Sequence, residues 1–172
     1  MSDAAILARL DRLESEAAIR RTVARYFQIC DRLGPETPFT ELGELFTRDA
    51  CWEGKGRYES AFGRYDGRSE IVAMIRSYCM PTPHFAMTAH FFSADDIAVE
   101  GETGVGKWMM LQTSTYADGT ADLRSACLTM RFERENERWR IALFRTENIF
   151  SRRIDHWNDR EVIPVPDQTA GA

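Results

Sequence analysis

The feature that most constrains this chain is a change in its hydrophobic pattern at residue 83. Up to that point apolar residues recur every three or four positions, a spacing typical of amphipathic helices. Beyond it apolar and polar residues alternate, which predicts four strands, at residues 84–99, 104–117, 122–134 and 138–151. The turns between them are short and favour antiparallel pairing of consecutive strands. Helices followed by such strands predict an α+β fold.

The chain before residue 83 predicts three helices. The first covers residues 3–33, a short second one begins at Thr37-Pro38, and the third begins in the turn at residues 66–69 and ends at Pro81. The predicted buried face of the first helix comprises Ile6, Leu10, Leu13, Ala17, Val23, Phe27, Cys30 and Leu33.

Residues 50–54 and 57–65 predict a short hairpin between the second and third helices. A strongly bent sheet wrapped on the long first helix would enclose a cone-shaped cavity. No internal repeat or linker divides the chain, so we expect one domain over residues 1–151, followed by a polar tail at 152–172.

Composition excludes several classes of function. The net charge is −5 with both signs well mixed, which argues against a nucleic-acid partner. No apolar run approaches the roughly 20 residues of a membrane span, so no membrane partner is expected. The N-terminus has no basic n-region and no cleavage pattern, so no secretion signal is expected. The four cysteines form no CxxC pair, so we expect a cytoplasmic protein with reduced, buried cysteines.

One motif resembles a nucleotide site. Residues 101–107 (GETGVGK) match the start of a P-loop, but Trp108 replaces the Ser or Thr that would hold Mg²⁺. The segment also continues into a strand and not a helix. The sequence therefore predicts a glycine-rich turn here and no nucleotide.

Acid–base chemistry is the activity that the residues support best. His84 stands at the start of a predicted core strand, and Asp31 lies at the C-terminal end of the first helix, where the helix dipole disfavours a carboxylate. His84 and His90 are six residues apart, about 20 Å along a regular strand, so no shared metal is predicted. Tyr26, Asp31 and His84 are the candidate catalytic residues, although each could equally be structural.

A set of ordered motifs resembles the SnoaL-like branch of the nuclear-transport-factor-2-like (NTF2-like) superfamily. The set comprises Tyr26-Phe-x-x-x-Asp31, Leu45-Phe46-x-x-Asp49-Ala50-x-Trp52, Gly67 with Ile71, His84-Phe85, and Trp139-Arg140-Ile141. The resemblance covers about residues 5–150. It implies three helices packed on a strongly curved, mixed but mainly antiparallel sheet around one deep apolar pocket.

The resemblance also implies an activity. Members similar by motif, such as scytalone dehydratase, bile-acid 7α-dehydratase and hexachlorocyclohexane dehydrochlorinase, use a histidine and an aspartate without metal or organic cofactor. Tyr26 and Asp31 match the helical Tyr and Asp of the bile-acid enzyme, and His84 matches its catalytic histidine. That enzyme's further carboxylate falls on Gln112 here, so the donor to the leaving group and the substrate could differ.

We therefore expect a cofactor-independent, dehydratase-type lyase for a hydrophobic, aromatic or polycyclic small molecule. Asp31 would orient His84, which would remove a proton, while Tyr26 would donate a hydrogen bond to the substrate. Arg145 either faces the pocket or pairs with Glu147 or Asp49. The predicted lining comprises Phe27, Trp52, Phe62, Met74, Tyr78, Met87, Trp108, Met110, Gln112, Leu128, Met130, Phe144 and Arg145.

Two other kinds of function stay open. A ketosteroid-isomerase-like proton shuttle or a retro-aldol C–C lyase would use the same base, and a non-catalytic ligand-binding or oligomerisation module would need none. We also expect a homo-oligomer, a dimer or trimer, formed through the outer sheet face at residues such as Met109 and Leu111.

Overall fold

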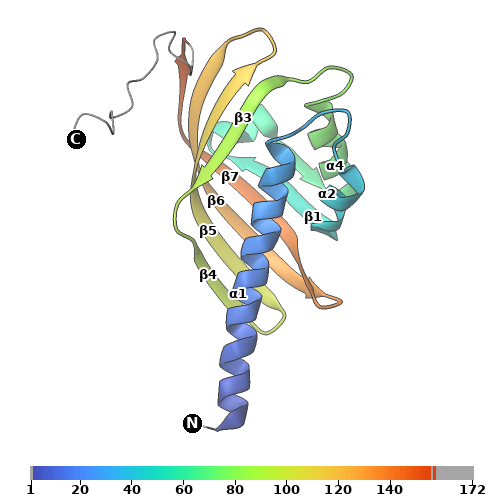
Figure 1. Ribbon diagram of the computed structural model, residues 1–172, viewed down its shortest axis with the longest axis vertical. Helices are drawn as coiled ribbons and strands as arrows, with labels where there is room; N and C mark the ends of the chain where they lie inside the picture. The colour runs from blue at the N-terminus through green and yellow to red at the C-terminus, as the bar shows by residue number, and fades with distance from the viewer. Residues whose placement is uncertain (1, 156, 158–172) are drawn as a thin grey trace, which may run out of the picture.

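The computed structural model describes residues 2–155 and 157 (Figure 1). The helices are α1 (Asp3–Cys30), α2 (Phe39–Glu44), α3 (Arg57–Phe62) and α4 (Arg68–Ser77). The strands are β1 (Phe46–Lys55), β2 (Arg64–Asp66), β3 (Phe85–Phe92), β4 (Asp96–Glu100), β5 (Thr103–Tyr116), β6 (Ala121–Glu135) and β7 (Arg138–Ile154). None of the helices in this part of the chain has the length and apolar character to cross a membrane.

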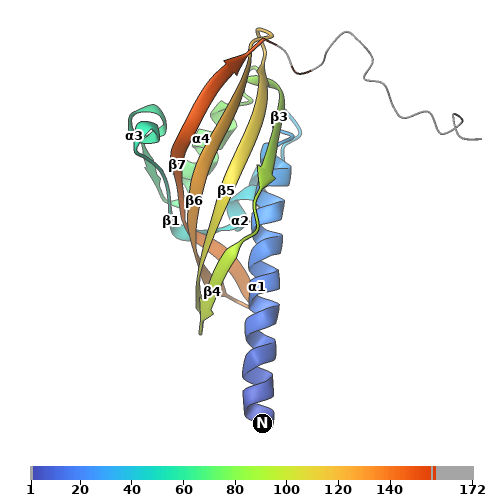
Figure 2. The ribbon, with the colours of Figure 1, turned by 90° about the vertical axis from the view of Figure 1, so that its left-hand side faces the viewer.

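All seven strands form one curved sheet, whose order is β2-β1-β7-β6-β5-β3, with β4 also paired to β5. Every pairing is antiparallel except that of β1 with β7, which is parallel. Figures 1 and 2 show α1 running along one side of this sheet, with α2 and α4 beside β1. The predicted α+β class, with helices on a curved, mixed and mainly antiparallel sheet, is confirmed.

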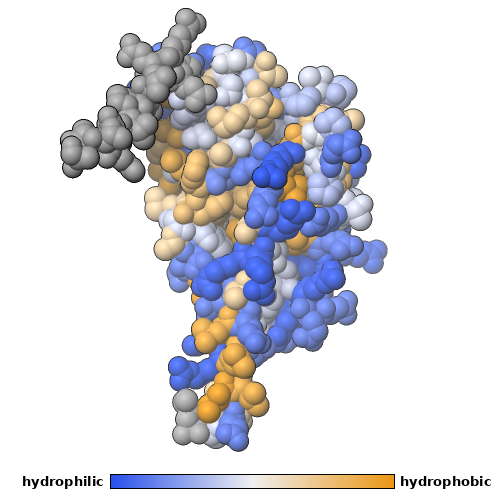
Figure 3. Space-filling model, viewed as in Figure 1, coloured by the Kyte–Doolittle hydropathy of each residue, from blue (hydrophilic) through white to orange (hydrophobic). Residues whose placement is uncertain are grey.

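The first helix is longer than the sheet surface that it covers. Its residues are exposed up to Glu14, and packing begins at Ser15 and continues through Ile19 and Val23. The prediction that Ile6, Leu10 and Leu13 are buried is therefore wrong. These side chains form an apolar stripe on the part of α1 that extends past the sheet (Figure 3).

The predicted hairpin at 50–54 and 57–65 is wrong in its second half. Residues 57–62 form α3, and only β2 pairs with β1. Gly56 and Gly63 flank the helix with φ values of 58° and 69°, a backbone conformation that glycine adopts without strain. Tyr58 and Phe62, four residues apart, pack with ring centroids at 4.6 Å, a helical spacing that also fits an alternating strand.

The long strand predicted at 84–99 is divided. Its halves, β3 and β4, both pair with β5, and the break between them follows Phe92. Asp95 in the break accepts a hydrogen bond of 2.7 Å from Nε of Arg20, which ties this point of the sheet to α1. The other three predicted strands are present as β5, β6 and β7.

Two further predictions concern the ends of strands. The glycine-rich segment 101–107 forms the turn between β4 and β5 and the first residues of β5, as predicted. The last strand continues to Ile154, so the first residues of the predicted tail 152–172 belong to the sheet. Residues 156 and 158–172 of that tail lie outside the described residues.

Candidate active site

A cavity of about 330 Å³ lies between the concave face of the sheet, the C-terminal half of α1 and the helices α3 and α4. This size is at the lower end for ligand-binding cavities in proteins. Its walls are mainly aromatic and aliphatic, and comprise Tyr26, Phe27, Cys30, Leu33, Trp52, Tyr58, Phe62, Met74, Ile75, Tyr78, His84, Phe85, Thr88, His90, Met110, Gln112, Tyr116, Arg124, Leu128, Phe144 and Thr146.

His90, in the wall of the cavity, is paired with the carboxylate of Asp31, which does not itself line the cavity. Oδ1 of Asp31 lies 2.5 Å from Nδ1 of His90, and Oδ2 accepts a weaker bond of 3.4 Å from the His90 backbone N–H. The His90 side chain is 11% exposed and that of Asp31 is 27% exposed. Because Asp31 occupies Nδ1, Nε2 of His90 is the nitrogen left for chemistry in the cavity.

Local structure places these two residues. Asp31 is the C-cap of α1, where its backbone N–H bonds to Phe27 O at 2.8 Å. His90 lies on β3 and is paired in register with Gln112 on β5. The Phe27 ring packs against the His90 ring, with centroids 4.9 Å apart, and limits its rotation. The end of a helix and the middle of a strand, both held by backbone bonds, therefore fix the pair.

The predicted pairing of Asp31 with His84 is wrong. His84 precedes β3, is exposed, and packs against Tyr78 and Tyr116, with ring centroids at 5.7 and 5.1 Å. It does line the cavity, as His90 does. The two histidines thus share a cavity while only His90 reaches the carboxylate.

Tyr26 lies in the cavity wall, as the sequence predicts. Its hydroxyl accepts a hydrogen bond of 3.2 Å from Nε1 of Trp52, whose ring stacks on Phe144 at 5.4 Å. Burial raises the pKa of Tyr26 well above its usual value, so the phenol keeps its proton and remains a donor. Burial also raises the pKa of the nearby Cys30 thiol to about 12, which keeps it neutral.

Of the thirteen predicted lining residues, nine border the cavity and four do not. The nine are Phe27, Trp52, Phe62, Met74, Tyr78, Met110, Gln112, Leu128 and Phe144. Met87 is 37% exposed and borders a smaller hollow beside Asp31. Trp108 and Met130 are packed in the core farther along the sheet. Arg145 donates from Nε to Glu53 at 2.6 Å, so the prediction of an ion pair is right in kind, although the partner is neither Glu147 nor Asp49.

A model of the SnoaL-like domain matches residues 11–145, which is most of the chain. The chain belongs to the SnoaL-like family. No curated protein sequence matches it.

Several solved structures resemble this SnoaL-like protein. A type 2 hexachlorocyclohexane dehydrochlorinase, LinA, has a TM-score of 0.74 and 19% identity, covering 90% of this chain and 99% of that one. A putative scytalone dehydratase from Novosphingobium aromaticivorans has a TM-score of 0.69 and 15% identity, covering 90% of this chain and 95% of that one. An NTF2-like protein with a cystatin-like fold from the same species has a TM-score of 0.67 and 24% identity, covering 86% of this chain and 90% of that one. At these identities the likeness establishes the NTF2-like fold.

The sequence analysis of this SnoaL-like chain missed His90, Arg124 and Tyr116. Of these three, only Arg124 carried a signal in the sequence. On β6 the even-numbered positions Leu128 and Met130 are buried, so Arg124 shares their face. An arginine on an apolar face is a departure from alternation that the sequence alone displays. For Tyr116, at the end of β5, no comparable signal exists.

Proposed function

We propose that this protein is a cofactor-independent lyase that removes a proton and a leaving group from an apolar ring compound. The observation that carries the proposal is the 2.5 Å contact between Asp31 and His90 at the wall of an aromatic cavity. A carboxylate that holds one imidazole nitrogen leaves the other as a positioned general base. In the apolar surroundings of such a cavity, oriented dipoles act more strongly than they do in water.

The reaction divides into defined proton and electron movements. Nε2 of His90 takes a proton from a substrate carbon, and that C–H electron pair becomes the new C=C bond. The bond to the leaving group breaks with its electron pair, and His90 returns its proton to a departing hydroxide, which leaves as water. Asp31 stabilises the imidazolium between these steps. The Tyr26 hydroxyl already accepts a hydrogen bond from Trp52, and its O–H can donate a hydrogen bond to the leaving group.

Two of the similar structures carry the names of a dehydrochlorinase and a scytalone dehydratase, and both names describe eliminations. Those names favour elimination over isomerisation or retro-aldol cleavage for this chain. The aromatic walls, including the stacked Trp52 and Phe144, suit a flat substrate. His84 lines the same cavity and remains the second candidate for the base.

The mass of the product tests the reaction type. The purified protein is incubated with a panel of aromatic and polycyclic hydroxy ketones, and products are followed by mass spectrometry. Elimination lowers the mass by one water, isomerisation conserves it, and retro-aldol cleavage gives two fragments. The same incubation with Asp31→Asn and His90→Ala should give no product. Turnover that persists in both variants would exclude the dyad.

A further inference from the structure

A row of three polar side chains crosses the concave face of the sheet. His90 on β3 pairs in register with Gln112 on β5, and Gln112 pairs with Arg124 on β6. Residues opposite each other on neighbouring strands point to the same face, so all three side chains face one way, and all three line the cavity. Two strand spacings, about 10 Å, separate the backbones of His90 and Arg124.

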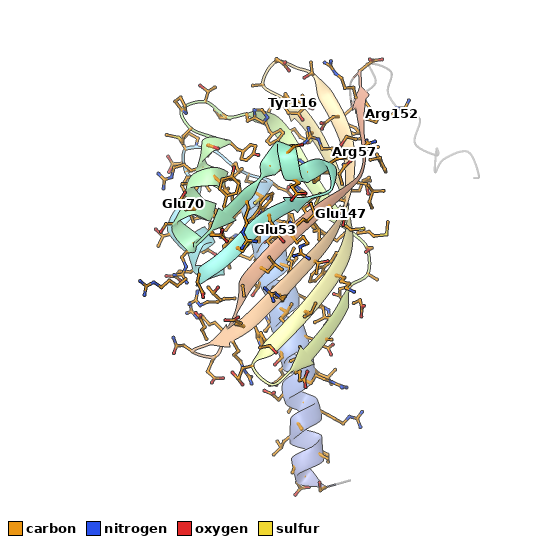
Figure 4. The ribbon with its side chains drawn as sticks, turned by 180° about the vertical axis from the view of Figure 1, so that it is seen from behind. Glu53, Arg57, Glu70, Tyr116, Glu147 and Arg152 are labelled. Atoms are coloured by element: carbon orange, nitrogen blue, oxygen red, sulfur yellow. The ribbon has the colours of Figure 1, made fainter. Side chains whose placement is uncertain are left out.

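Arg124 is held by two neighbours. Its Nε donates to Oδ2 of Asp122 at 2.6 Å, and Nη2 donates to the hydroxyl of Tyr116. Tyr116 in turn donates to the same carboxylate oxygen at 2.7 Å. Tyr116 lies near one end of the sheet, as Figure 4 shows. Burial, together with the bond to Asp122, raises the pKa of Tyr116 to about 12, so it keeps its proton and this arrangement persists at neutral pH.

The guanidinium still has donors to offer. It carries five N–H groups, and the two bonds above use two of them. No side chain or backbone oxygen of the described residues accepts from Nη1 of Arg124. Among those residues, Arg124 is also the one lining group with a permanent charge. A cation facing an apolar chamber with unused donors is arranged to meet an oxygen that the ligand brings.

The partner carboxylate supports a role in a site. Asp122 is 7% exposed, and its Oδ1 is buried with no hydrogen-bond partner among the described residues. A buried ion pair of this kind contributes little to stability compared with apolar packing. Asp122 also balances the charge of Arg124, so the cavity suits a neutral acceptor better than a full anion before reaction.

We propose that Arg124 binds a carbonyl oxygen of the substrate, on the far side of an apolar ring from His90. The substrate class is then an aryl or polycyclic ketone whose acidic C–H is conjugated with that carbonyl. As His90 takes the proton, negative charge moves onto the oxygen, and its bond to the guanidinium strengthens. This catalytic consequence rests on the proposed function, whereas the preference for a carbonyl in binding does not. Tyr116 and Asp122 act as positioning residues.

Matched probes test the binding preference without turnover. 1-Tetralone and tetralin share one ring skeleton and differ by the carbonyl, and their dissociation constants can be measured by calorimetry. Wild type should bind tetralone about ten-fold or more tightly than tetralin, the order expected for a hydrogen bond to a charged donor. Arg124→Met should bring the two affinities to near equality. Arg131→Met, on the same strand but exposed on the other face, should leave the preference unchanged.

Further measurements distinguish a failure of this proposal from a loss of folding and from a failure of the proposed roles of Asp31 and His90. The double variant Asp122→Asn/Arg124→Met removes both charges of the ion pair. It replaces Arg124→Met in the binding comparison if that single variant unfolds. In wild type, the infrared carbonyl stretch of bound tetralone should lie below its value in cyclohexane. His90→Ala and Asp31→Asn should keep the tetralone preference even though they lose turnover. A preference that survives loss of Arg124, or an unshifted carbonyl stretch, would overturn the proposal.

Discussion

Asp31 and His90 are 59 residues apart in the chain, and their side chains meet at 2.5 Å where the end of α1 crosses β3. The helix supplies a carboxylate just past its last turn, and the strand supplies an imidazole on its concave face. The fold thereby brings a base and its orienting acceptor together at a cavity wall.

Loss of either member of this pair should remove activity without unfolding the protein. Asp31→Asn and His90→Ala should each lower kcat/KM by about 10²- to 10⁴-fold, the usual contribution of a positioned general base. His84→Ala, which removes an exposed imidazole from the same cavity, should lower it far less. Steady-state kinetics with thermal melting of each variant checks this. A larger loss in His84→Ala than in His90→Ala would reverse the assignment.

Glu53 should make the stability of the protein depend on pH. This residue, labelled in Figure 4, is 1% exposed. Its carboxylate pairs with Arg145, Arg64 and Lys55 at 2.6, 3.0 and 3.5 Å. Burial alone would raise its pKa, but the hydrogen bond and charge of Arg145, helped by the other cations, lower it below the usual value. The folded state therefore gains stability from ionised Glu53 at neutral pH and loses it as pH falls through the folded pKa.

The substitution Glu53→Gln measures this contribution. At pH 7 it should cost about 1.5–3 kcal/mol, the range for hydrogen bonds to charged groups. The difference from wild type should shrink as pH falls below about 4, the usual range of a glutamate pKa, and should disappear below the lower folded pKa, where the carboxyl is protonated in both states. Urea unfolding at several pH values gives the curve. Glu133→Gln, at an exposed position of β6, should run parallel to wild type, and a Glu53→Gln curve that does so too would contradict the assignment.

Gly54 should tolerate no side chain. A Cβ built there would lie 2.2 Å from the backbone oxygen of Tyr58, which cannot move without shifting α3. Gly54→Ala should therefore cost about 1–3 kcal/mol and displace Tyr58 from the cavity wall. Gly34→Ala is the matched control, because nothing lies within 4 Å of its added Cβ. Calorimetric melting compares the two variants, and equal melting temperatures would show that α3 adjusts freely.

The outer sheet face should carry the contact between copies. Phe91 pairs with Leu111, Leu111 with Ser125, and Ser125 with Phe150, so one uncharged row crosses four strands with three large apolar side chains exposed. A row of this kind can face its own copy about a two-fold axis. Leu111→Lys should reduce the mass measured by light scattering towards that of one chain. If Leu7→Lys on the exposed part of α1 does so instead, the helix is the interface.

Much of the sheet could be predicted because one of its faces is buried. On β5 and β6 the buried positions recur with period two, so register and face follow from the alternation of apolar residues. The break after Phe92 was not predicted because the residues of β3 and β4, on either side of it, both keep a strand pattern. Helix α3 was not predicted because its limits are set by the backbone conformations of Gly56 and Gly63. The pattern of its six residues does not reveal those conformations.

The site was predictable in its parts but not in its pairing. Asp31 stood out as an acidic residue at an unfavourable helix end, and the structure supplies its reason in His90. Choosing between His84 and His90 requires the register of β3 on β5, including the shift near Phe85, and the place where α1 ends. These are long-range relationships, and residue spacing along the chain does not encode them in a form that can be read directly.

The stack of Trp52 on Phe144 gives the cavity an optical signal of its own. An indole that borders the chamber and donates to Tyr26 will change its emission when a ring enters beside it or when that phenol finds a new acceptor. Occupancy can then be followed by fluorescence in unlabelled protein. The emission of the other tryptophans is measured in a Trp52→Phe variant and subtracted from that of wild type. Compounds can thus be sorted by entry into the chamber before any turnover has been found.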